Sequence, residues 1–212
     1  MTWMRMCGQT WAGAAASFLG MWIVMMVAMM LPSLMSSLRR YRETVGESGE
    51  TYLTALAGAG YFFVWTVLGV MIFPLGAALA TAEMQLPALA RAVPIVAAIV
   101  IVIAGALQLS AWKAHHLARC RAAPEHDRTL RADAITAWRY GVRLGLHCSC
   151  SCAGPMAILI VIGVMDLRAM ALVMAAITVE RLAPAGARIA RAIGVVAVVA
   201  GCILLVRAAG LA

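Results

Sequence analysis

Apolar residues in this chain form long unbroken stretches rather than short alternating runs. Crossing a bilayer as a helix takes about 20 such residues. Polar segments separate six stretches of roughly that length, at residues 17–38, 55–80, 92–112, 144–165, 167–183 and 189–209. Backbone groups in lipid must form their hydrogen bonds internally, so these stretches are expected to be helices and not strands. The pattern predicts an all-α fold, a polytopic transmembrane helical bundle of about six spans.

The fifth stretch, 167–183, is the weakest of the six because it is short and carries Glu180 near its end. The Asp166-Leu167-Arg168 turn before it is tight, which predicts a helical hairpin between the fourth and fifth spans. Residues 1–16 lack the basic leader, short apolar core and cleavage site of a secretory signal. The first stretch is therefore expected to be a true membrane span.

The composition supports a membrane protein whose main partner is the lipid bilayer. Hydrophobic residues make up 64% of the chain and charged residues 12%, with a mean hydropathy of +0.93. Soluble domains average roughly 45–50% apolar and about 25% charged residues. The composition excludes a soluble globular domain and predicts a single transmembrane domain over residues 1–212.

The distribution of Lys and Arg predicts how the chain lies in the membrane. From the N-terminal tail through the five loops to the C-terminal end, the counts are 1, 3, 1, 7, 1, 3 and 1. The positive-inside rule makes the segments with higher counts cytoplasmic, which puts both termini outside a bacterial inner membrane. Topology thus accounts for the net charge of +8. No nucleic-acid partner is expected, because no aromatic interleaving or known binding module accompanies that charge.

The segment 113–143 is predicted to be a basic cytoplasmic loop between spans three and four. Span three is expected to continue as a helix to about Ala123, where Pro124 stops it because proline lacks the backbone donor. A second short helix, from about Thr129 to Arg143, would then lie against the headgroups and bind anionic lipid.

The run His147-Cys148-Ser149-Cys150-Ser151-Cys152 holds half of the six cysteines. On a helix Cys148 and Cys152 share a face, whereas Cys150 points about 200° away, so all three reach one ion only if this turn is irregular. Pro155 favours such an irregularity because it removes one helical hydrogen bond. A reducing compartment disfavours disulfides, and thiolates there suit Cu(I) or zinc. The alternative is close packing of small, soft side chains.

A second candidate element, Lys113-Ala-His-His-Leu-Ala-Arg-Cys120, leaves span three on the same side of the membrane as the cysteine run. His116 and Cys120 are spaced i, i+4 and share a helix face, with Lys113 near it, and such a pair suits metal ligation. Interfacial histidines are the alternative interpretation. Because both segments carry nitrogen or sulfur ligands at the same depth, the cysteine run is predicted to be a half-site that His116 and Cys120 complete.

Span one carries a methionine stripe. Met21, Met25 and Met29 recur at every fourth residue, and Met26 and Met30 form an adjacent ridge. Thioethers bind Cu(I), so Met25 and Met29 are expected to form an approach path or a second site. Methionine also fills irregular helix interfaces, and packing is the alternative.

Glu180 is a candidate site residue, because an ionisable residue in or near a membrane span is costly and therefore a functional candidate by default. It is either an edge carboxylate, solvated or paired with Arg181, or a supporting group that completes the site or orients a ligand histidine. Lys113 and His147 are assigned supporting positions as well. The sequence contains no phosphate loop, His-Glu-x-x-His or Ser/His/Asp signature, so it does not indicate an enzyme.

Several of these segments together resemble the bacterial DUF2182 proteins, which are described as predicted metal-binding integral membrane proteins. The segments are Trp22 to Pro32, Lys113 to Arg121, Gly145 to Cys152 and Glu180 to Gly186. The resemblance covers about residues 20–205 and implies a membrane protein that binds metal. The family pattern has a cysteine where His116 stands, and adjacent cysteines with a tryptophan where this chain has Cys150-Ser151-Cys152-Ala153. Members often carry an additional N-terminal span, so a truncated or divergent member is expected.

Residues and resemblance together predict a six-helix inner-membrane protein that binds a soft metal, copper or alternatively zinc, near its cytoplasmic face. The expected ligands are Cys148, Cys152 and Cys120, with Cys150 and His116 as alternatives. The role would be acquisition, transfer or delivery to a membrane metalloenzyme. Two other interpretations stay open: a non-catalytic accessory subunit of a larger membrane complex, whose motifs serve helix packing, and a membrane thiol redox protein.

Overall fold

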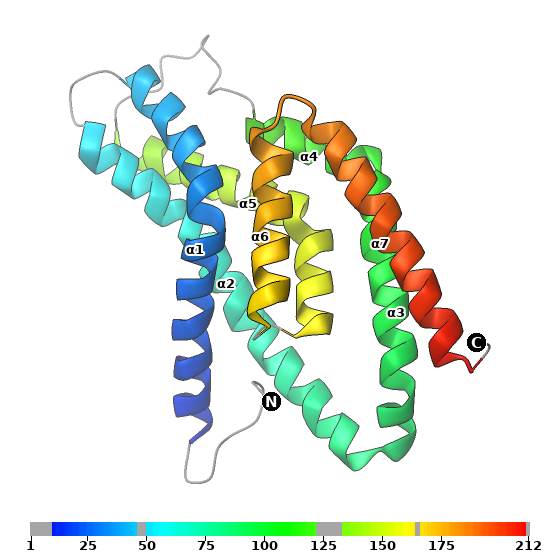
Figure 1. Cartoon of the computed structure of the whole chain (residues 1–212). Helices are drawn as coiled ribbons and strands as arrows, with labels where there is room; N and C mark the ends of the chain where they lie inside the picture. The colour runs from blue at the N-terminus through cyan, green and yellow to red at the C-terminus, as the bar shows by residue number, and fades with distance from the viewer. Residues whose placement is uncertain (1–9, 46–49, 122–132, 164–165, 211–212) are drawn as a thin grey trace.

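The computed structural model describes residues 10–45, 50–121, 133–163 and 166–210, which contain seven helices and no strand. The helices are α1 (Trp11–Val45), α2 (Glu50–Gln85), α3 (Pro87–Leu109), α4 (Ala111–Arg121), α5 (Ala134–Ile162), α6 (Leu167–Leu182) and α7 (Gly186–Ala208). Figure 1 shows them packed side by side, with α5 and α6 in the middle and α3 beside α7 at one edge. The predicted all-α helical bundle is confirmed.

Within the described residues, five helices are long and apolar enough to cross a membrane: α1, α2, α3, α5 and α7. This agrees with a multi-pass membrane protein. Helix α6 has 16 residues, or about 24 Å along its axis, which is less than the ~30 Å hydrocarbon core of a bilayer. Asp166 caps α6 by accepting hydrogen bonds from the amides of Arg168 (2.8 Å) and Ala169 (3.1 Å). Helix α6 occupies the position of the predicted fifth span, and its crossing of the membrane stays a prediction.

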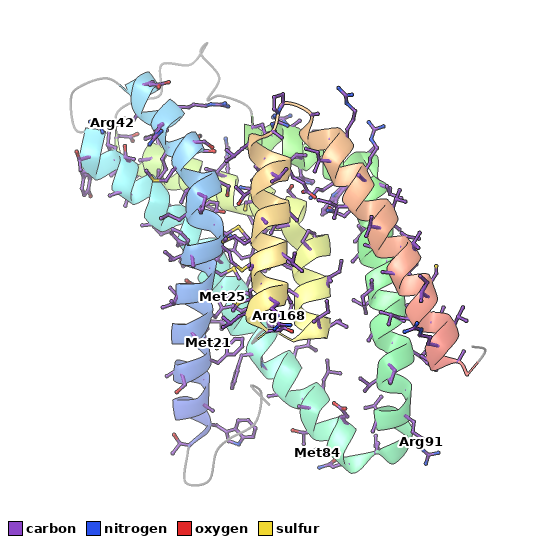
Figure 2. The ribbon with its side chains drawn as sticks, in the orientation of Figure 1. Met21, Met25, Arg42, Met84, Arg91 and Arg168 are labelled. Carbon is purple, nitrogen blue, oxygen red and sulfur yellow. The ribbon has the colours of Figure 1, made fainter. Side chains whose placement is uncertain are left out.

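The helices alternate in direction, so that segments rich in arginine gather at one end of the bundle. Figure 2 labels Arg42 at that end and Arg91 and Arg168 toward the other. The Trp11 end of α1 and the Ala208 end of α7 point toward the same end (Figure 1). This arrangement agrees with the alternating Lys and Arg counts, while the side of the membrane that each end faces stays a prediction.

Close backbone contact fixes α5 against α2. A Cβ added at Gly141 of α5 would overlap the backbone carbonyl of Ala57 on α2, and one added at Gly60 of α2 would lie 2.7 Å from the carbonyl oxygen of Trp138. Small residues at such crossings let membrane helices approach each other. The contact therefore depends on glycine at these positions, and it presses the face of α5 that carries Cys148 against α2.

Two helix boundaries differ from the sequence expectation. Helix α3 ends at Leu109 because Ser110 is extended (φ −75°, ψ 152°). The Ser110 hydroxyl accepts a hydrogen bond from the backbone N–H of Lys113 (3.2 Å). Ser110 thereby caps the start of α4. The expected continuous helix to about Ala123 is therefore wrong at Ser110, and residues 122–132 lie outside the described residues. The expected separate helix up to Arg143 is also wrong, because residues 134–143 are the first turns of α5.

Candidate metal centre

The thiols of Cys148 and Cys152 lie on the buried face of α5, with 0% and 1% of each residue exposed. Helix α5 is unbroken from Ala134 to Ile162, so the expected irregular turn does not form. The three cysteines keep helical spacing, and Cys150, which is half-buried, projects from a different face. The structure therefore separates Cys150 from the other two thiols of the run.

The Cys148 thiol is enclosed between α1 and α2. Its Sγ lies 2.8 Å from the hydroxyl oxygen of Tyr61 and 4.0 Å from the Sδ of Met30. A metal–sulfur bond is about 2.3 Å long, so two sulfurs that share one ion lie up to ~4.6 Å apart. Cys148 and Met30 are already within that limit.

Arg181 of α6 contacts two buried thiols, those of Cys120 and Cys152. Its Nη2 lies 3.7 Å from the Sγ of Cys120 and 3.7 Å from the Sγ of Cys152, while Nη1 donates to the hydroxyl of Ser33 (3.2 Å). Arg181 is 9% exposed, and its Nε has no hydrogen-bond partner among the described residues. A cation in such surroundings attracts negative charge, and the groups best placed to supply it are the two thiols.

A buried ion pair lies beside this group. Lys113 Nζ donates to Glu180 Oε2 (2.7 Å) and to the Ser151 carbonyl (2.5 Å), and Gln108 Nε2 donates to Glu180 Oε1 (2.7 Å). Pro155 lacks an N–H, so the Ser151 carbonyl has no helical partner and accepts from the lysine instead. Glu180 is only 1% exposed. The alternative of a solvated edge carboxylate is therefore wrong, and the ion-pair partner of Glu180 is Lys113.

His116 lies against His147 of α5, with their Nδ1 atoms 3.1 Å apart. The Trp112 ring also packs against it, at 4.6 Å between ring centroids. Burial, and after it the charge of His115, lower the pKa of His116, so this ring is neutral at pH 7. The structure thus pairs His116 with another histidine, and its membership of the cysteine site stays a prediction.

Met25 and Met29 are buried in the same core cluster as Cys148 and Cys152. Figure 2 shows sulfur atoms gathered beside α6, near the part of α1 that carries Met25. The direct contact with a cysteine is made by Met30, which the sequence assigned only to the adjacent ridge. Periodicity separates the two methionine ridges but does not tell which of them faces α5.

Two further contacts of the thiols were missed from the sequence. Tyr61 gave no signal beyond its position in an apolar span. Arg181 did give one, because a guanidinium at the end of a short apolar span requires a polar or anionic partner in the bundle. The sequence analysis considered Arg181 as a partner of Glu180, whereas the structure places it against Cys120 and Cys152.

The donor atoms of this group define what it can bind. Burial raises the pKa of the Cys120 thiol to about 11, although Arg181 opposes the shift. Cys120 is therefore protonated at neutral pH in the metal-free protein. No group of three or more His, Cys, Asp and Glu side chains in the described residues is arranged to hold a metal ion, so the thioether of Met30 is needed in any larger set. Thiols with a thioether are soft donors, the kind that select Cu(I).

Comparison with known proteins bears on this chemistry. The model of the PpoB2 family, described as a copper chaperone, matches residues 19–204. The chain belongs to this family. No curated protein and no solved structure matches the chain. Membership of the PpoB2 family confirms the copper-related part of the sequence prediction, while the identification with DUF2182 stays a prediction. The matched range contains Met30, Cys120, Cys148 and Cys152.

Proposed function

We propose that this PpoB2-family protein is a membrane-embedded chaperone that holds Cu(I) and delivers it to a membrane metalloenzyme. The ligands would come from Cys148, Cys152, Cys120 and Met30, near the cytoplasmic face of a bacterial inner membrane. The single observation that carries the proposal is the convergence of these sulfurs from α1, α4 and α5 in one buried region, where two of them contact Arg181.

The buried charge at this site favours Cu(I) over zinc. One Cu(I) bound by two thiolates carries a net charge of −1, which the Arg181 guanidinium would neutralise inside the bundle. Zinc in a structural site takes four ligands, whereas no group of three or more His, Cys, Asp and Glu side chains in the described residues is arranged to hold a metal ion. Burial of a charge is tolerated when it is paired, so the cation already present favours an anionic copper–thiolate centre.

The membrane location and the delivery role rest on different support. The long apolar helices support a multi-pass protein, and the alternation of arginine-rich segments supports the cytoplasmic face for the α4 end. The chaperone description of the PpoB2 family supports delivery of copper, and a membrane metalloenzyme is the recipient that we propose. An enzyme in the same membrane would receive the ion without its release into water.

The test is Cu(I) binding by the purified protein in detergent under reducing conditions. We expect about one equivalent of Cu(I) per chain, because the sulfurs form one group. The double substitution Cys148→Ser/Cys152→Ser should abolish binding. Cys202→Ser is the matched control, since Cys202 is an exposed cysteine of α7, and it should bind copper like the unchanged protein. Full copper binding by the double variant would refute the site.

A second candidate is the accessory-subunit role, which the dense packing of the same residues favours. Cys148, Cys152, Met25 and Met29 all belong to one core cluster, and methionine and cysteine pack well at helix interfaces. A metal-free protein that co-purifies with a partner complex, and keeps that partner after Cys148→Ser/Cys152→Ser, would favour this role. Reversible thiol trapping without any bound metal would instead favour the thiol redox interpretation.

A further inference from the structure

Two histidines, His116 of α4 and His147 of α5, face each other between their helices. Their Nδ1 atoms lie 3.1 Å apart, and both residues are half-buried. Helix α4 lies at the arginine-rich end of the bundle (Figure 1). The contacts that hold two of the thiols against Arg181 do not use either ring, so the pair is a separate group of metal-ligating atoms.

The separation of the two Nδ1 atoms suits a metal ion bound to both. Metal–nitrogen bonds of about 2.0–2.1 Å let two nitrogens that share one ion lie up to ~4.2 Å apart. At the observed 3.1 Å, the two bonds would meet at an angle of about 100°. Imidazole is a ligand that copper accepts. Two ligands at this angle leave the other side of the ion open, so a third ligand can bind the ion and draw it away.

His116 also stands between the protein surface and a buried thiol. Trp112, His116 and Cys120 are each four residues apart, so they follow one another along one face of α4, with about 5–6 Å between successive Cβ atoms. The Trp112 ring packs against His116 at 4.6 Å between ring centroids. Trp112 is 43% exposed, His116 is half-buried and Cys120 is 6% exposed. An ion held at His116 is therefore one helical turn from a buried sulfur.

We propose that His116 and His147 form a second, weaker Cu(I) site, where incoming copper is held before it passes to the thiol of Cys120. This inference rests on the proposed function and adds the point at which the cargo enters. Thiolates and thioethers are softer donors than imidazoles and suit Cu(I) better, so copper moves from the histidines toward the sulfurs. The pair raises the rate of loading and leaves the final occupancy of the sulfur site unchanged.

The transfer step needs neither an oxidant nor a reductant. The Cys120 sulfur forms a bond to copper, the bond between copper and His116 Nδ1 breaks, and the thiol proton is taken up by the nitrogen that copper has left. Copper stays Cu(I), and the total charge does not change. His147 releases the ion in the same way when a second sulfur binds.

The test is the rate at which the full-length protein in detergent removes Cu(I) from its coloured complex with bicinchoninate. His147→Ala should load about tenfold more slowly than the unchanged protein, and its final copper content should be the same. His115→Ala is the matched control, because it removes an exposed histidine from α4 and leaves the contact between the two Nδ1 atoms in place. This control should load at the unchanged rate.

Two conservative variants separate metal binding from a structural contact. His147→Gln keeps a side chain that can hydrogen-bond to His116, whereas His147→Cys supplies a soft metal ligand. We expect His147→Cys to load close to the unchanged rate and His147→Gln to load as slowly as His147→Ala. Recovery with glutamine and not with cysteine would show that the pair is only a hydrogen bond, and the inference would be wrong.

Failure of this inference and failure of the proposed function give different results. If every His147 variant loads at the unchanged rate and still binds one equivalent of copper, the inference is wrong and the proposed function stands. A lower final copper content in His147→Ala would make His147 a ligand of the sulfur site itself, which also overturns the inference. If the unchanged protein takes up no Cu(I) from bicinchoninate or from acetonitrile, the proposed function is refuted and the inference falls with it.

Discussion

Glu180 and Arg181 are neighbours in sequence, both are buried, and their charges are handled in opposite ways. The carboxylate of Glu180 meets an ammonium from Lys113 and an amide from Gln108. The guanidinium of Arg181 meets a hydroxyl and two thiols, all neutral when protonated. The first group is complete within the metal-free protein. The second contains a positive charge whose best available counter-charge is a pair of thiolates.

This difference separates a structural element from a binding element in the same buried region. A buried ion pair with its hydrogen bonds satisfied ties α3, α4, α5 and α6 together whether or not copper is present. A buried cation beside thiols is stabilised further when the thiols lose their protons, which metal binding requires. The four predictions below test that separation, from the largest expected effect to the smallest.

Breaking the ion pair should have the largest effect, and the effect should not depend on copper. Glu180→Gln leaves the Lys113 ammonium buried without its counter-charge, and removing one partner of a buried pair costs about 3–5 kcal/mol. Thermal unfolding in detergent should show the loss equally in metal-free and copper-loaded protein. The double variant Lys113→Met/Glu180→Gln should recover much of it. A double variant as unstable as the two single losses combined would contradict the pairing.

Arg181→Met should give the opposite pattern. It removes a charge that has no carboxylate partner in the described residues, so the metal-free protein should unfold at an unchanged or higher temperature. Cu(I) affinity should fall by about 10–100-fold, the effect typical of groups that support metal ligands. Competition with a Cu(I) chelator measures this, and Arg181→Lys, which keeps the charge, should lose less. A metal-free protein destabilised as strongly as Glu180→Gln would show that Arg181 is purely structural.

Tyr61→Phe should have a smaller effect on the same site. The Tyr61 hydroxyl lies 2.8 Å from Cys148 Sγ, and it would donate to the thiolate once copper is bound. A typical intramolecular hydrogen bond contributes about 0.5–1.5 kcal/mol net, so Cu(I) affinity should fall by about two- to tenfold. Tyr140→Phe serves as the control in the same competition assay, because Tyr140 stacks on Tyr41 instead. Equal affinities for the two variants would count against Cys148 as a ligand.

His116→Ala should have the smallest effect. The His116 ring faces His147, with 3.1 Å between the Nδ1 atoms, and the sulfurs around Arg181 do not require it. Cu(I) stoichiometry should be unchanged and affinity should change by less than about threefold, within the weak effect of surface substitutions. Cys120→Ser is the comparison, since it removes a proposed ligand one helical turn away. A loss of copper in His116→Ala as large as in Cys120→Ser would show that His116 is one of the ligands.

Much of the fold followed from the sequence because hydropathy acts over long segments. Apolar stretches of about 20 residues predicted the helices, and Asp166 marked the turn of the α5–α6 hairpin. Ser110 was missed, because one capping hydroxyl interrupts a helix without altering its hydropathy. The continuity of α5 from Ala134 was missed for a related reason: its polar first turns resemble a separate headgroup helix until they pack against α2 through Gly141.

The candidate site was predicted only in part. The i, i+4 spacing put Cys148 and Cys152 on one buried face of α5, while Cys150, kept as an alternative ligand, lies on a different face, and its part in the site stays a prediction. The choice of Met30 over Met25 and Met29 depends on how α1 is rotated against α5, which no local pattern encodes. The pairing of Glu180 with Lys113 joins α6 to α4, so it could not be predicted from the sequence neighbour Arg181.

The sequence by itself determined the kind of protein: helical, membrane-embedded, rich in soft sulfur donors, and copper-related by its family. These properties depend on composition, segment length and spacing along single helices, all of which are local. Only the tertiary structure decided which sulfurs meet, which of two adjacent charges is already paired, and that His116 faces His147 between α4 and α5. Those properties depend on the rotation and crossing of helices, which are set by close packing at positions such as Gly141 and by no single segment alone.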